Sequence, residues 1–308
     1  MPKKKKKEEE IKEEPTEITD RDIKDEKERK EKETKEKDKK KKKEKWEEIS
    51  RLKVEVDFWK TDLHGKEIGI RQKDQLRAKS RQFSKDMDIY GSVKIGGEDK
   101  GHVGFRKDEW EDNHPEQGEL SRLVVRYFTE TDRWLASIEQ NNIKGLMLSL
   151  GYERGTPVFD VFHQGFTKIF HLEKIERGSG SMDRVMVPLI LEKEGKDIDY
   201  FIIAEKRFTI GSDWKVFRAQ EKDKTLAEFD SKKFNIGGKV VIDIYDPELA
   251  KNKVFINTMV LFGALIKFWD EVVDRLADYR KKYMKNELPY KPDRHELQLL
   301  ENPRGRRN

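Results

Sequence analysis

The longest apolar run of the chain, residues 254–269 (VFINTMVLFGALIKFW), is hydrophobic on nearly every side of a helix. A helix with this pattern has to be surrounded by other parts of the protein. It is too short to cross a bilayer, which needs about 20 mostly apolar residues. From Phe268 to Tyr279 the apolar positions narrow to one stripe beside charged residues. We therefore predict a single helix over residues 247–285, with Asp246 as N-cap, that begins in the core and ends half exposed.

The remaining apolar residues occur in short runs separated by glycine, proline and charged clusters. Residues 51–58 alternate apolar and charged positions, which is typical of a strand with one buried face. A short helix is predicted over 131–143, and a loop or an exposed helix over 71–88. Further strands are predicted at 67–70, 89–95, 102–105, 123–128, 146–150, 158–162, 167–172, 185–191, 200–204, 207–210, 214–218, 226–229, 234–236 and 240–245.

Many strands followed by one apolar helix favour a particular fold class. Strands with one apolar face need a cover, and an apolar helix needs walls. An antiparallel barrel closed around the C-terminal helix meets both needs and removes exposed sheet edges. We therefore predict a mainly β (α+β) barrel domain over residues 49–290. The Lys/Glu-rich arm (residues 1–48) and the basic tail (residues 291–308) have too few apolar residues to fold and are predicted to be disordered.

The amino-acid composition indicates where the protein resides more clearly than what it does. The net charge of +5 is the small difference between 67 basic and 62 acidic residues, so it does not by itself indicate nucleic acid. The chain has no cysteine, which excludes disulfides, thiol catalysis and cysteine-bound zinc and suits a reducing compartment. No apolar signal segment follows the basic N-terminus. We expect a cytoplasmic protein, with peripheral membrane association as one option.

A series of features between Tyr200 and Trp269 carries a family resemblance. They are a Tyr-Phe strand start, Phe-x-Ile-Gly at 208–211, Leu-Ala-Glu-Phe at 226–229, Phe-x-Ile-Gly-Gly at 234–238, the run VIDIYD at 241–246 and the apolar helix. The series resembles the C-terminal half of the tubby-like superfamily, and most of all its LURP-one-related and phospholipid-scramblase-like branch. The resemblance implies a twelve-stranded barrel around a central C-terminal helix, with a role in phosphoinositide binding or lipid movement at membranes.

The chain also departs from this family. It has no cysteine for the palmitoylation of scramblases, and its helix continues as a charged extension. No residue can be matched to the basic phosphoinositide ligands of the tubby branch. A helix that fills a barrel cannot also anchor it, so the resemblance implies peripheral membrane binding.

Three stretches have the partial pattern of known catalytic or nucleotide-binding motifs. Residues 96–101 approach a phosphate-binding loop, but His102 and Val103 stand where Lys and Ser or Thr are needed, so a hairpin turn is predicted. Residues 295–299 begin like a zinc-protease helix but have Leu299 where the second ligand belongs. Residues 178–181 lack the frame of a serine-hydrolase elbow and are predicted to be a linker. We find no nucleophile, base and orienting group together, and no cofactor site.

Two groups of residues are weighed as metal sites. His163 and His171 lie on neighbouring predicted strands and would need Asp160 or Glu173 as a further ligand. Hydrogen-bonded histidines in the core or at an edge are the commoner arrangement. Asp243, Asp246 and Glu248 offer carboxylates for calcium, but they lack the loop glycine of an EF-hand, and helix capping already explains them. No metal is predicted.

The remaining candidates are basic residues that could meet an anionic surface if both ends of the domain emerge on one side. The leading hypothesis is a non-enzymatic, peripheral module that binds anionic membranes or phosphoinositides. The alternative is a nucleic-acid or ribosome-associated protein, although we find no mixed basic and aromatic motif for stacking bases. A third hypothesis is an enzyme whose site the sequence conceals, which hydrolytic or metal-dependent activity abolished by His163→Ala would support. The residues are Lys39, Lys40, Lys41, Lys42, Lys43, Lys281, Lys282, Lys285, Arg304, Arg306 and Arg307.

Overall fold

The computed structural model describes eleven stretches of the chain. They are residues 50–58, 77–79, 86–110, 120–131, 133–165, 170–175, 183–192, 198–206, 213–222, 224–231 and 239–288. The predicted arm (residues 1–48), the tail (residues 291–308) and the predicted strands at 67–70, 207–210 and 234–236 lie outside these stretches. The chain divides into two units, Met1–Ile49 and Ser50–Asn308, and all the described residues belong to the second.

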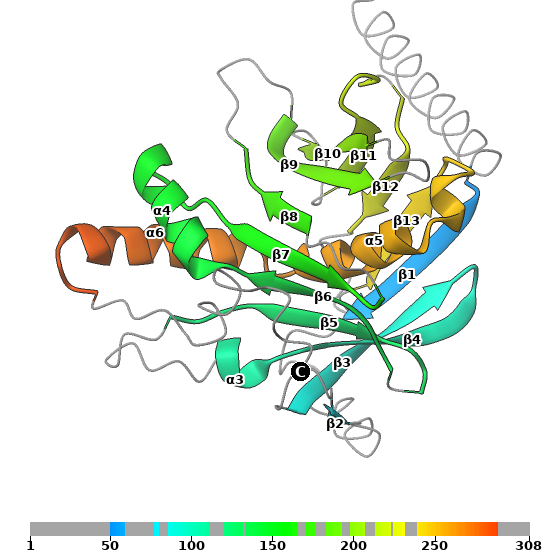
Figure 1. Cartoon of the computed structure of the whole chain (residues 1–308), viewed down its shortest axis with the longest axis horizontal. Coiled ribbons are helices and arrows are strands. Elements are labelled where there is room, and N and C mark those ends of the chain that lie inside the picture. Colours follow the sequence, from blue (N-terminus) through cyan, green and yellow to red (C-terminus); the bar gives the residue numbers. More distant parts are fainter. Residues whose placement is uncertain are drawn as a thin grey trace, which may run out of the picture. The chain divides into compact units, whose positions relative to one another are not determined.

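The strands form one antiparallel sheet that curls into a nearly closed barrel (Figure 1). Twelve of them follow the order β8-β7-β6-β5-β4-β3-β1-β13-β12-β11-β10-β9, and β2 pairs with β3 outside it. β8 and β9, the two ends of this order, lie next to each other. The predicted mainly β barrel is therefore confirmed. The strands are β1 (Leu52–Phe58), β2 (Arg77–Lys79), β3 (Asp86–Ile95), β4 (Glu98–Phe105), β5 (Val124–Phe128), β6 (Trp134–Gln140), β7 (Val158–His163), β8 (Phe170–Glu173), β9 (Asp183–Glu192), β10 (Ile198–Lys206), β11 (Trp214–Arg218), β12 (Ala227–Asp230) and β13 (Lys239–Ile244).

The first and last strands of the barrel pair with each other. β1 is antiparallel to β13, with Val54 opposite Ile242, and on its other side to β3. The alternation of β1 buries Val54, Val56 and Phe58, as its period of two predicts. β3 and β4 form the predicted hairpin, in which Gly96 and Gly97 both have positive φ, at 62° and 86°. A two-residue turn of this kind needs positive φ at both positions, which accounts for the glycine pair.

The apolar helix α5 (Lys253–Leu265) lies inside the barrel. It contacts β1, β5, β6, β7 and β13, and its aromatic side chains reach β10, β11 and β12. The Phe262 ring lies 5.2 Å from Trp214 and 5.6 Å from Phe229, and the Phe255 ring lies 5.7 Å from Phe201. The predicted core helix is confirmed, because strands surround it on all sides.

The predicted single helix over 247–285 is wrong in its continuity. The chain forms a short 3₁₀ helix, η4 (Leu249–Lys251), then α5, then α6 (Trp269–Met284). Asp246 does act as a cap, because its carboxylate accepts hydrogen bonds from the amides of Glu248 and Leu249 at 2.9 and 3.1 Å. However, it caps η4, and Asn252 caps α5 through the amide of Phe255 at 3.1 Å. The second cap starts a new helix and ends the first.

A tight turn separates α5 from α6. The amides of residues 267–269 bond to carbonyl groups three residues earlier, as in a 3₁₀ turn, whereas an α-helix bonds four residues back. Phe268 occupies this turn and is fixed by an aromatic cluster. Its ring lies 5.5 Å from Phe58, 5.4 Å from Phe105 and 5.5 Å from Trp110. The burial of Phe268 among these rings coincides with the break between the two helices, which apolar periodicity alone does not predict.

A second correction concerns residues 131–152. The predicted helix at 131–143 is the strand β6, and the predicted strand at 146–150 lies in the helix α4 (Asn142–Tyr152). Both faces of β6 are buried over its last five residues, so its sequence lacks the alternation of a half-exposed strand. The side chain of Asn141 accepts a hydrogen bond from the amide of Lys144 at 3.0 Å and caps α4. The true helix therefore starts where the predicted one was expected to end.

Antiparallel pairing gives the barrel two different ends. The turn end is formed by the turn at 96–97, by the described residues between β5 and β6 and between β11 and β12, by Ser50 and by the start of α5. The helix end carries α3 (Lys107–Trp110), α4 and α6 (Figure 1). α5 begins at the turn end and α6 leads away from the opposite one. Of the helices in the described stretches, none is both long and apolar enough to cross a membrane.

The enclosed helix should dominate stability. We predict that Phe262→Ala lowers the free energy of unfolding by about 3–5 kcal/mol, because it leaves a cavity between Trp214 and Phe229. Urea unfolding followed by circular dichroism measures this value. Met284→Ala, at an exposed position of α6, should change it by less than about 0.5 kcal/mol. Equal effects of the two substitutions would contradict burial of α5 as the main source of stability.

Candidate functional site

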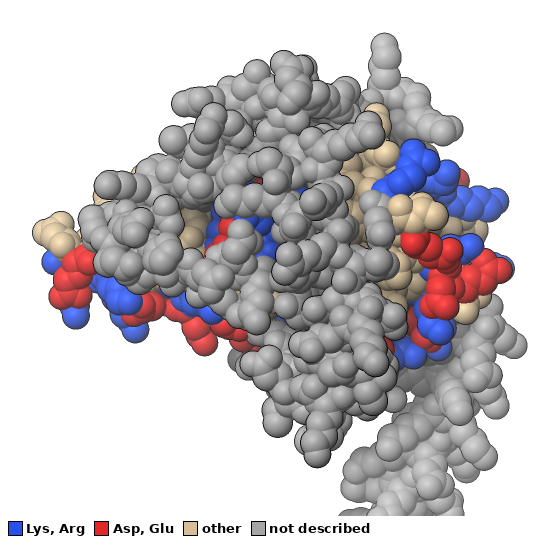
Figure 2. All heavy atoms as spheres, turned by 90° about the horizontal axis from the view of Figure 1, so that it is seen from below, with Lys and Arg blue, Asp and Glu red and all other residues tan. Residues whose placement is uncertain are grey.

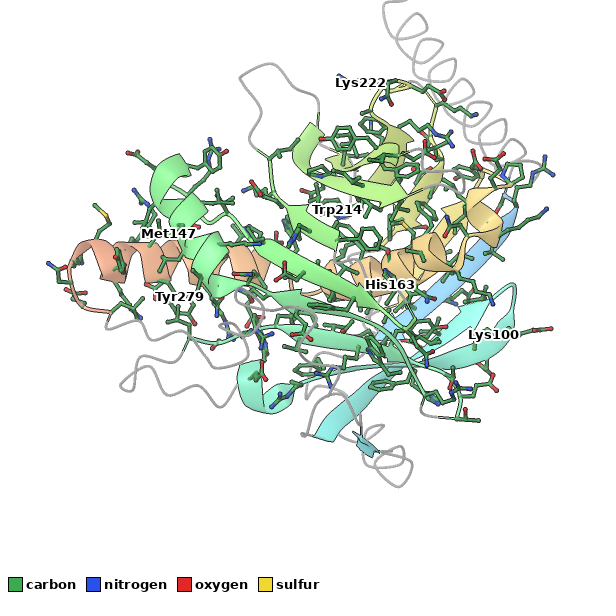
Figure 3. The ribbon with its side chains drawn as sticks, viewed as in Figure 1. Lys100, Met147, His163, Trp214, Lys222 and Tyr279 are labelled. Carbon is green, nitrogen blue, oxygen red and sulfur yellow. The ribbon has the colours of Figure 1, made fainter. Side chains whose placement is uncertain are left out.

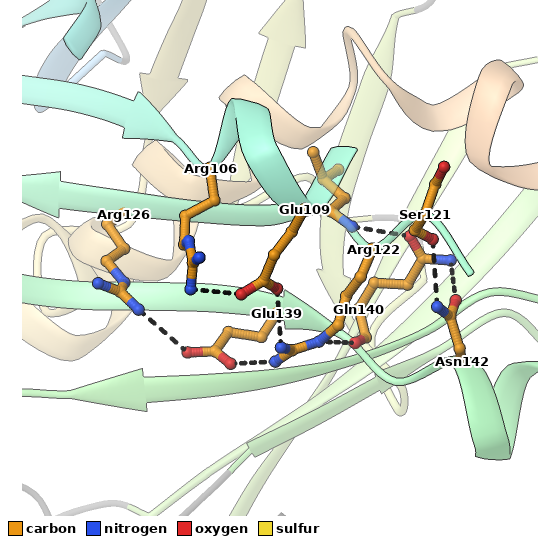
Figure 4. A network of polar contacts seen from close by, with 9 residues as sticks. Arg106, Glu109, Ser121, Arg122, Arg126, Glu139, Gln140 and Asn142 are labelled. Carbon is orange, nitrogen blue, oxygen red and sulfur yellow. Dashed lines mark hydrogen bonds and ion pairs between the residues drawn. The ribbon is translucent and has the colours of Figure 1, made fainter. Parts of the chain in front are cut away.

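The helix end contains a buried network of charged side chains (Figure 4). Arg122 forms ion pairs with Glu109, at 2.9 Å, and with Glu139. Arg106 pairs with the other oxygen of Glu109, and Arg126 lies 4.0 Å from Glu139. The three arginines and Glu139 are no more than 3% exposed. These five side chains join α3 to β4, β5 and β6.

Neutral polar groups continue this network toward α6. The Arg122 Nε donates to the carbonyl of Gln140 at 3.0 Å, and the Gln140 side chain donates to Asn142 at 2.7 Å. Asn142 donates to the carbonyl of Ser121 at 3.1 Å, and the amide of Ser121 donates to the Tyr279 hydroxyl of α6 at 3.2 Å. The network therefore connects the barrel, α4 and α6 through paired polar atoms.

The burial of this network limits what it can do chemically. Burial lowers the pKa of the Arg126 guanidinium to about 10, and the nearby carboxylate of Glu139 opposes that change. The guanidinium groups lie almost entirely out of solvent, so a soluble anion cannot reach them without local opening. We interpret the network as a structural feature that holds the elements of the helix end together. Buried charges are tolerated only where charged or polar partners compensate for their lost hydration.

A cation–π contact also connects α6 with α3. The Arg275 guanidinium of α6 lies 3.7 Å from the centre of the Trp110 ring and donates a hydrogen bond to the Trp110 carbonyl at 2.8 Å. Arg275 also pairs with Glu271 at 2.6 Å. α3 is thus held to α6 as well as to the barrel.

The two histidines weighed as metal ligands lie on opposite faces of the sheet. His163 points inward to α5, where its Nε2 lies 3.1 Å from the Thr258 hydroxyl (Figure 3). His171 is half exposed, and its Nδ1 lies 2.6 Å from a carboxylate oxygen of Asp160, on the outer face of β7. The two rings therefore cannot share one ion. Each has the hydrogen-bond partner expected of a structural histidine.

The acidic cluster near the start of α5 is also occupied by structural contacts. Asp243 accepts a hydrogen bond from the Ser50 hydroxyl at 2.9 Å, and Asp246 caps η4 and lies 3.6 Å from Arg218. Within the described stretches no three histidine or acidic side chains are grouped as metal ligands.

The turn end carries an excess of exposed positive charge among its described residues. Exposed acidic residues there are Glu98, Asp99, Glu130, Glu221 and Glu248. Some of these charges compensate each other, as in the ion pair between Lys100 and Glu98 at 2.6 Å. The exposed basic residues are Arg51, Lys53, Lys100, Arg133, Lys222, Lys224, Lys251 and Lys253.

The basic residues predicted at the C-terminal end lie on a surface of mixed charge. Lys281, Lys282 and Lys285 are exposed, and Lys282 pairs with Asp278 at 2.8 Å, which raises the pKa of Lys282. α6 contains four acidic and four basic residues and so has no net charge. Figure 2 shows basic and acidic side chains side by side where α6 ends, at the left of the view.

The structure describes only three of the predicted basic residues, Lys281, Lys282 and Lys285, so their grouping with the others stays a prediction. Lys39 to Lys43 and Arg304, Arg306 and Arg307 lie outside the described residues. The described domain begins with Ser50 at the turn end, whereas Lys281, Lys282 and Lys285 lie at the other end of the barrel.

Comparisons with known proteins do not assign the chain to a family. No family model, no curated protein and no solved structure matches the chain. The resemblance to the tubby-like superfamily therefore stays a prediction. The chemistry of the described residues is the remaining basis for a function.

The buried charge network is not among the features predicted from the sequence. One signal is present, because Arg126 stands inside the apolar strand VVRYF and Glu139 inside WLASIEQ. A charged residue within an apolar strand needs a buried partner. The partners come from residues that are 13 and 17 positions away from Arg122, and local patterns do not specify such pairs.

Breaking this network should be costly. We predict that Arg122→Met lowers the free energy of unfolding by about 3–5 kcal/mol, because Glu109 and Glu139 lose their shared buried cation. Urea unfolding measures the change. The matched control is Lys282→Met, which removes an exposed ion pair with Asp278 and should cost less than about 1 kcal/mol. A small effect of Arg122→Met would mean that the network contributes little to the fold.

The buried histidine makes stability depend on pH. Burial lowers the pKa of His163 to about 4, against an ordinary value of 6.5. As pH falls from 6.5 to 4, the unfolded chain takes up a proton that the folded protein excludes, so this group destabilises the fold by up to about 3 kcal/mol. His163→Gln should remove that part of the loss. The measurement is the difference in unfolding free energy between wild type and variant from pH 7 to pH 4, and a constant difference would contradict this assignment.

Proposed function

We propose that this protein is a non-enzymatic module that docks peripherally on anionic membrane surfaces through the turn end of its barrel. The observation that carries the proposal is the excess of exposed basic side chains there, eight against five acidic ones among the described residues. Ser50, which lies at this end, follows the lysine run Lys39–Lys43 by seven residues in the sequence. The basic residues of α6, by contrast, are balanced by acids on the same helix.

The fold favours binding of a ligand to the outer surface of the barrel over binding inside it. α5 fills the barrel, and Gly263 allows it to approach β13 so closely that an added Cβ would lie 3.2 Å from a methyl group of Ile242. Packing this close leaves no room for a further molecule between α5 and β13 at this point. A lipid is therefore expected to meet the outer surface of the barrel.

The attraction between one basic residue and an anionic bilayer is modest, but the contributions of several such residues add up. A lysine or arginine near an anionic bilayer contributes about 1 kcal/mol, and the attraction decays within about 8 Å at physiological ionic strength. A few exposed lysines at one end of the barrel can therefore set the orientation. Binding should weaken as salt increases.

Two matched triple variants of the full chain test the proposed end. Lys222, Lys224 and Lys251 are replaced by Gln at the turn end, and Lys281, Lys282 and Lys285 at the helix end. We expect the first triple variant to lower affinity for phosphatidylserine vesicles on the order of a hundredfold. The second should change it by less than about threefold. Co-sedimentation over a salt series gives both values.

Three outcomes would contradict the proposal. They are equal losses in the two triple variants, a loss only in the helix-end variant, and no binding of the wild-type chain to anionic vesicles. Single-stranded and duplex RNA are included as competitors. If RNA binds more tightly than vesicles of equal charge density, the nucleic-acid alternative replaces the membrane.

A further inference from the structure

The outer face of β9, β10 and β11 is more apolar than the outer face of β1. On β1 the residues that alternate with the core are Lys53, Glu55 and Asp57. On β10 and β11 the side chains of Ile202, Ala204 and Phe217 form a second apolar cluster, separate from the core around α5. These strands are therefore apolar on both faces, which is unusual for a strand that faces water on one side.

The register extends this apolar face to the turn end. Ile190 of β9 lies opposite Tyr200 of β10, and Ile202 lies opposite Phe217 of β11. Ile198 is two residues before Tyr200 and therefore points to the same side of the sheet. The residues Ile190, Ile198 and Tyr200 thus form one continuous patch, which we call the hairpin patch.

Exposure increases along this face toward its end. Ile202, Ala204 and Phe217 are buried, whereas Ile190 is 52% exposed and Ile198 is 69% exposed. Neighbouring large apolar side chains that remain exposed commonly mark a binding surface. The other four strongly exposed apolar residues of the described structure lie on α4 and α6, at the opposite end of the barrel.

Basic residues lie beside the hairpin patch. The amide of Ala219 bonds to the carbonyl of Tyr200 at 2.9 Å, and the turn that follows carries the exposed residues Lys222 and Lys224. Figure 3 shows Lys222 at the edge of the molecule. Tyr200, with an apolar ring and a polar hydroxyl, is a residue type enriched where a bilayer meets water. Acidic residues are also present: Glu192 occupies the register position opposite Ile198, and exposed Glu221 precedes Lys222 in the same turn. Apolar side chains flanked by lysines match the apolar edge and the anionic headgroups of a membrane better than the surface of another protein.

We propose that the hairpin patch enters the boundary between headgroups and acyl chains of an anionic bilayer, while Lys222 and Lys224 contact the headgroups. This inference rests on the proposed function and adds to it a defined insertion point. Insertion of two isoleucines contributes an attraction that salt does not screen. Binding should therefore keep a salt-resistant part.

The absence of cysteine from the sequence allows a site-specific test in the full chain. Ile198→Cys carries an environment-sensitive fluorophore, and Met284→Cys, at a position of similar exposure (64%) on α6, is the matched control. With phosphatidylserine vesicles we expect the label at position 198 to shift to shorter wavelength and to be quenched by lipids that carry a nitroxide on the acyl chain. The label at position 284 should show neither change.

A second variant measures the contribution to affinity without a label. Ile190→Thr combined with Ile198→Thr keeps the preference for strands and should lower affinity for the same vesicles at least about tenfold at high salt. Circular dichroism and thermal unfolding show whether this variant keeps the fold. The salt-resistant part of binding should be lost.

The outcomes separate this inference from the proposed function. Co-sedimentation of wild type without a change at position 198 would overturn insertion and leave the electrostatic docking. Failure of wild type to co-sediment at all would overturn both. A spectral shift at position 198 that rises with protein concentration in the absence of vesicles would overturn insertion in favour of contact between two copies of the chain.

Discussion

The apolar surface of α5 can leave water only if strands surround it on every side, and this requirement organises the rest of the protein. A single sheet that curls around the helix provides the walls, and the helix in turn covers the inner faces of β1, β5, β6, β7 and β13. Neither part has another way to bury its apolar side chains. The pairing of β1 with β13 places the first and last strands side by side, so the enclosure joins the two halves of the domain.

The helix end shows how the chain leaves this enclosure. Phe268 turns the chain inside an aromatic cluster, and α6 then lies against α3 and α4 with Trp269, Val272, Leu276 and Tyr279 buried. Charged and polar groups around Arg122 and Glu139 hold these elements together by specific pairing. The result is an end of the barrel in which most polar groups already have protein partners, which leaves little for an external ligand.

The turn end has the opposite character, because hairpin turns leave their side chains in solvent. Lysines and arginines collect there, and the apolar outer face of β9, β10 and β11 becomes exposed at the same end. A surface with basic residues next to exposed isoleucines has both components of peripheral membrane binding, a screened electrostatic part and an unscreened apolar one. This difference between the two ends is the reason why we place the proposed membrane contact at the turn end.

The sequence by itself determined the fold class, because alternating apolar positions and one all-round apolar helix have few joint solutions. It located β1, the β3–β4 hairpin and the strands from β7 to β13 within the described residues, since each depends on local periodicity. Only tertiary structure decided that β6 is a strand, that α5 and α6 are separate, and that Arg122 meets Glu109 and Glu139. These features depend on contacts between distant residues. Because both faces of β6 are buried, its sequence lacks the alternation of apolar and polar residues that identifies a strand. The helix is interrupted at Phe268, whose ring packs in an aromatic cluster. The grouping of Ile190 with Ile198 likewise follows from strand register, which periodicity does not specify.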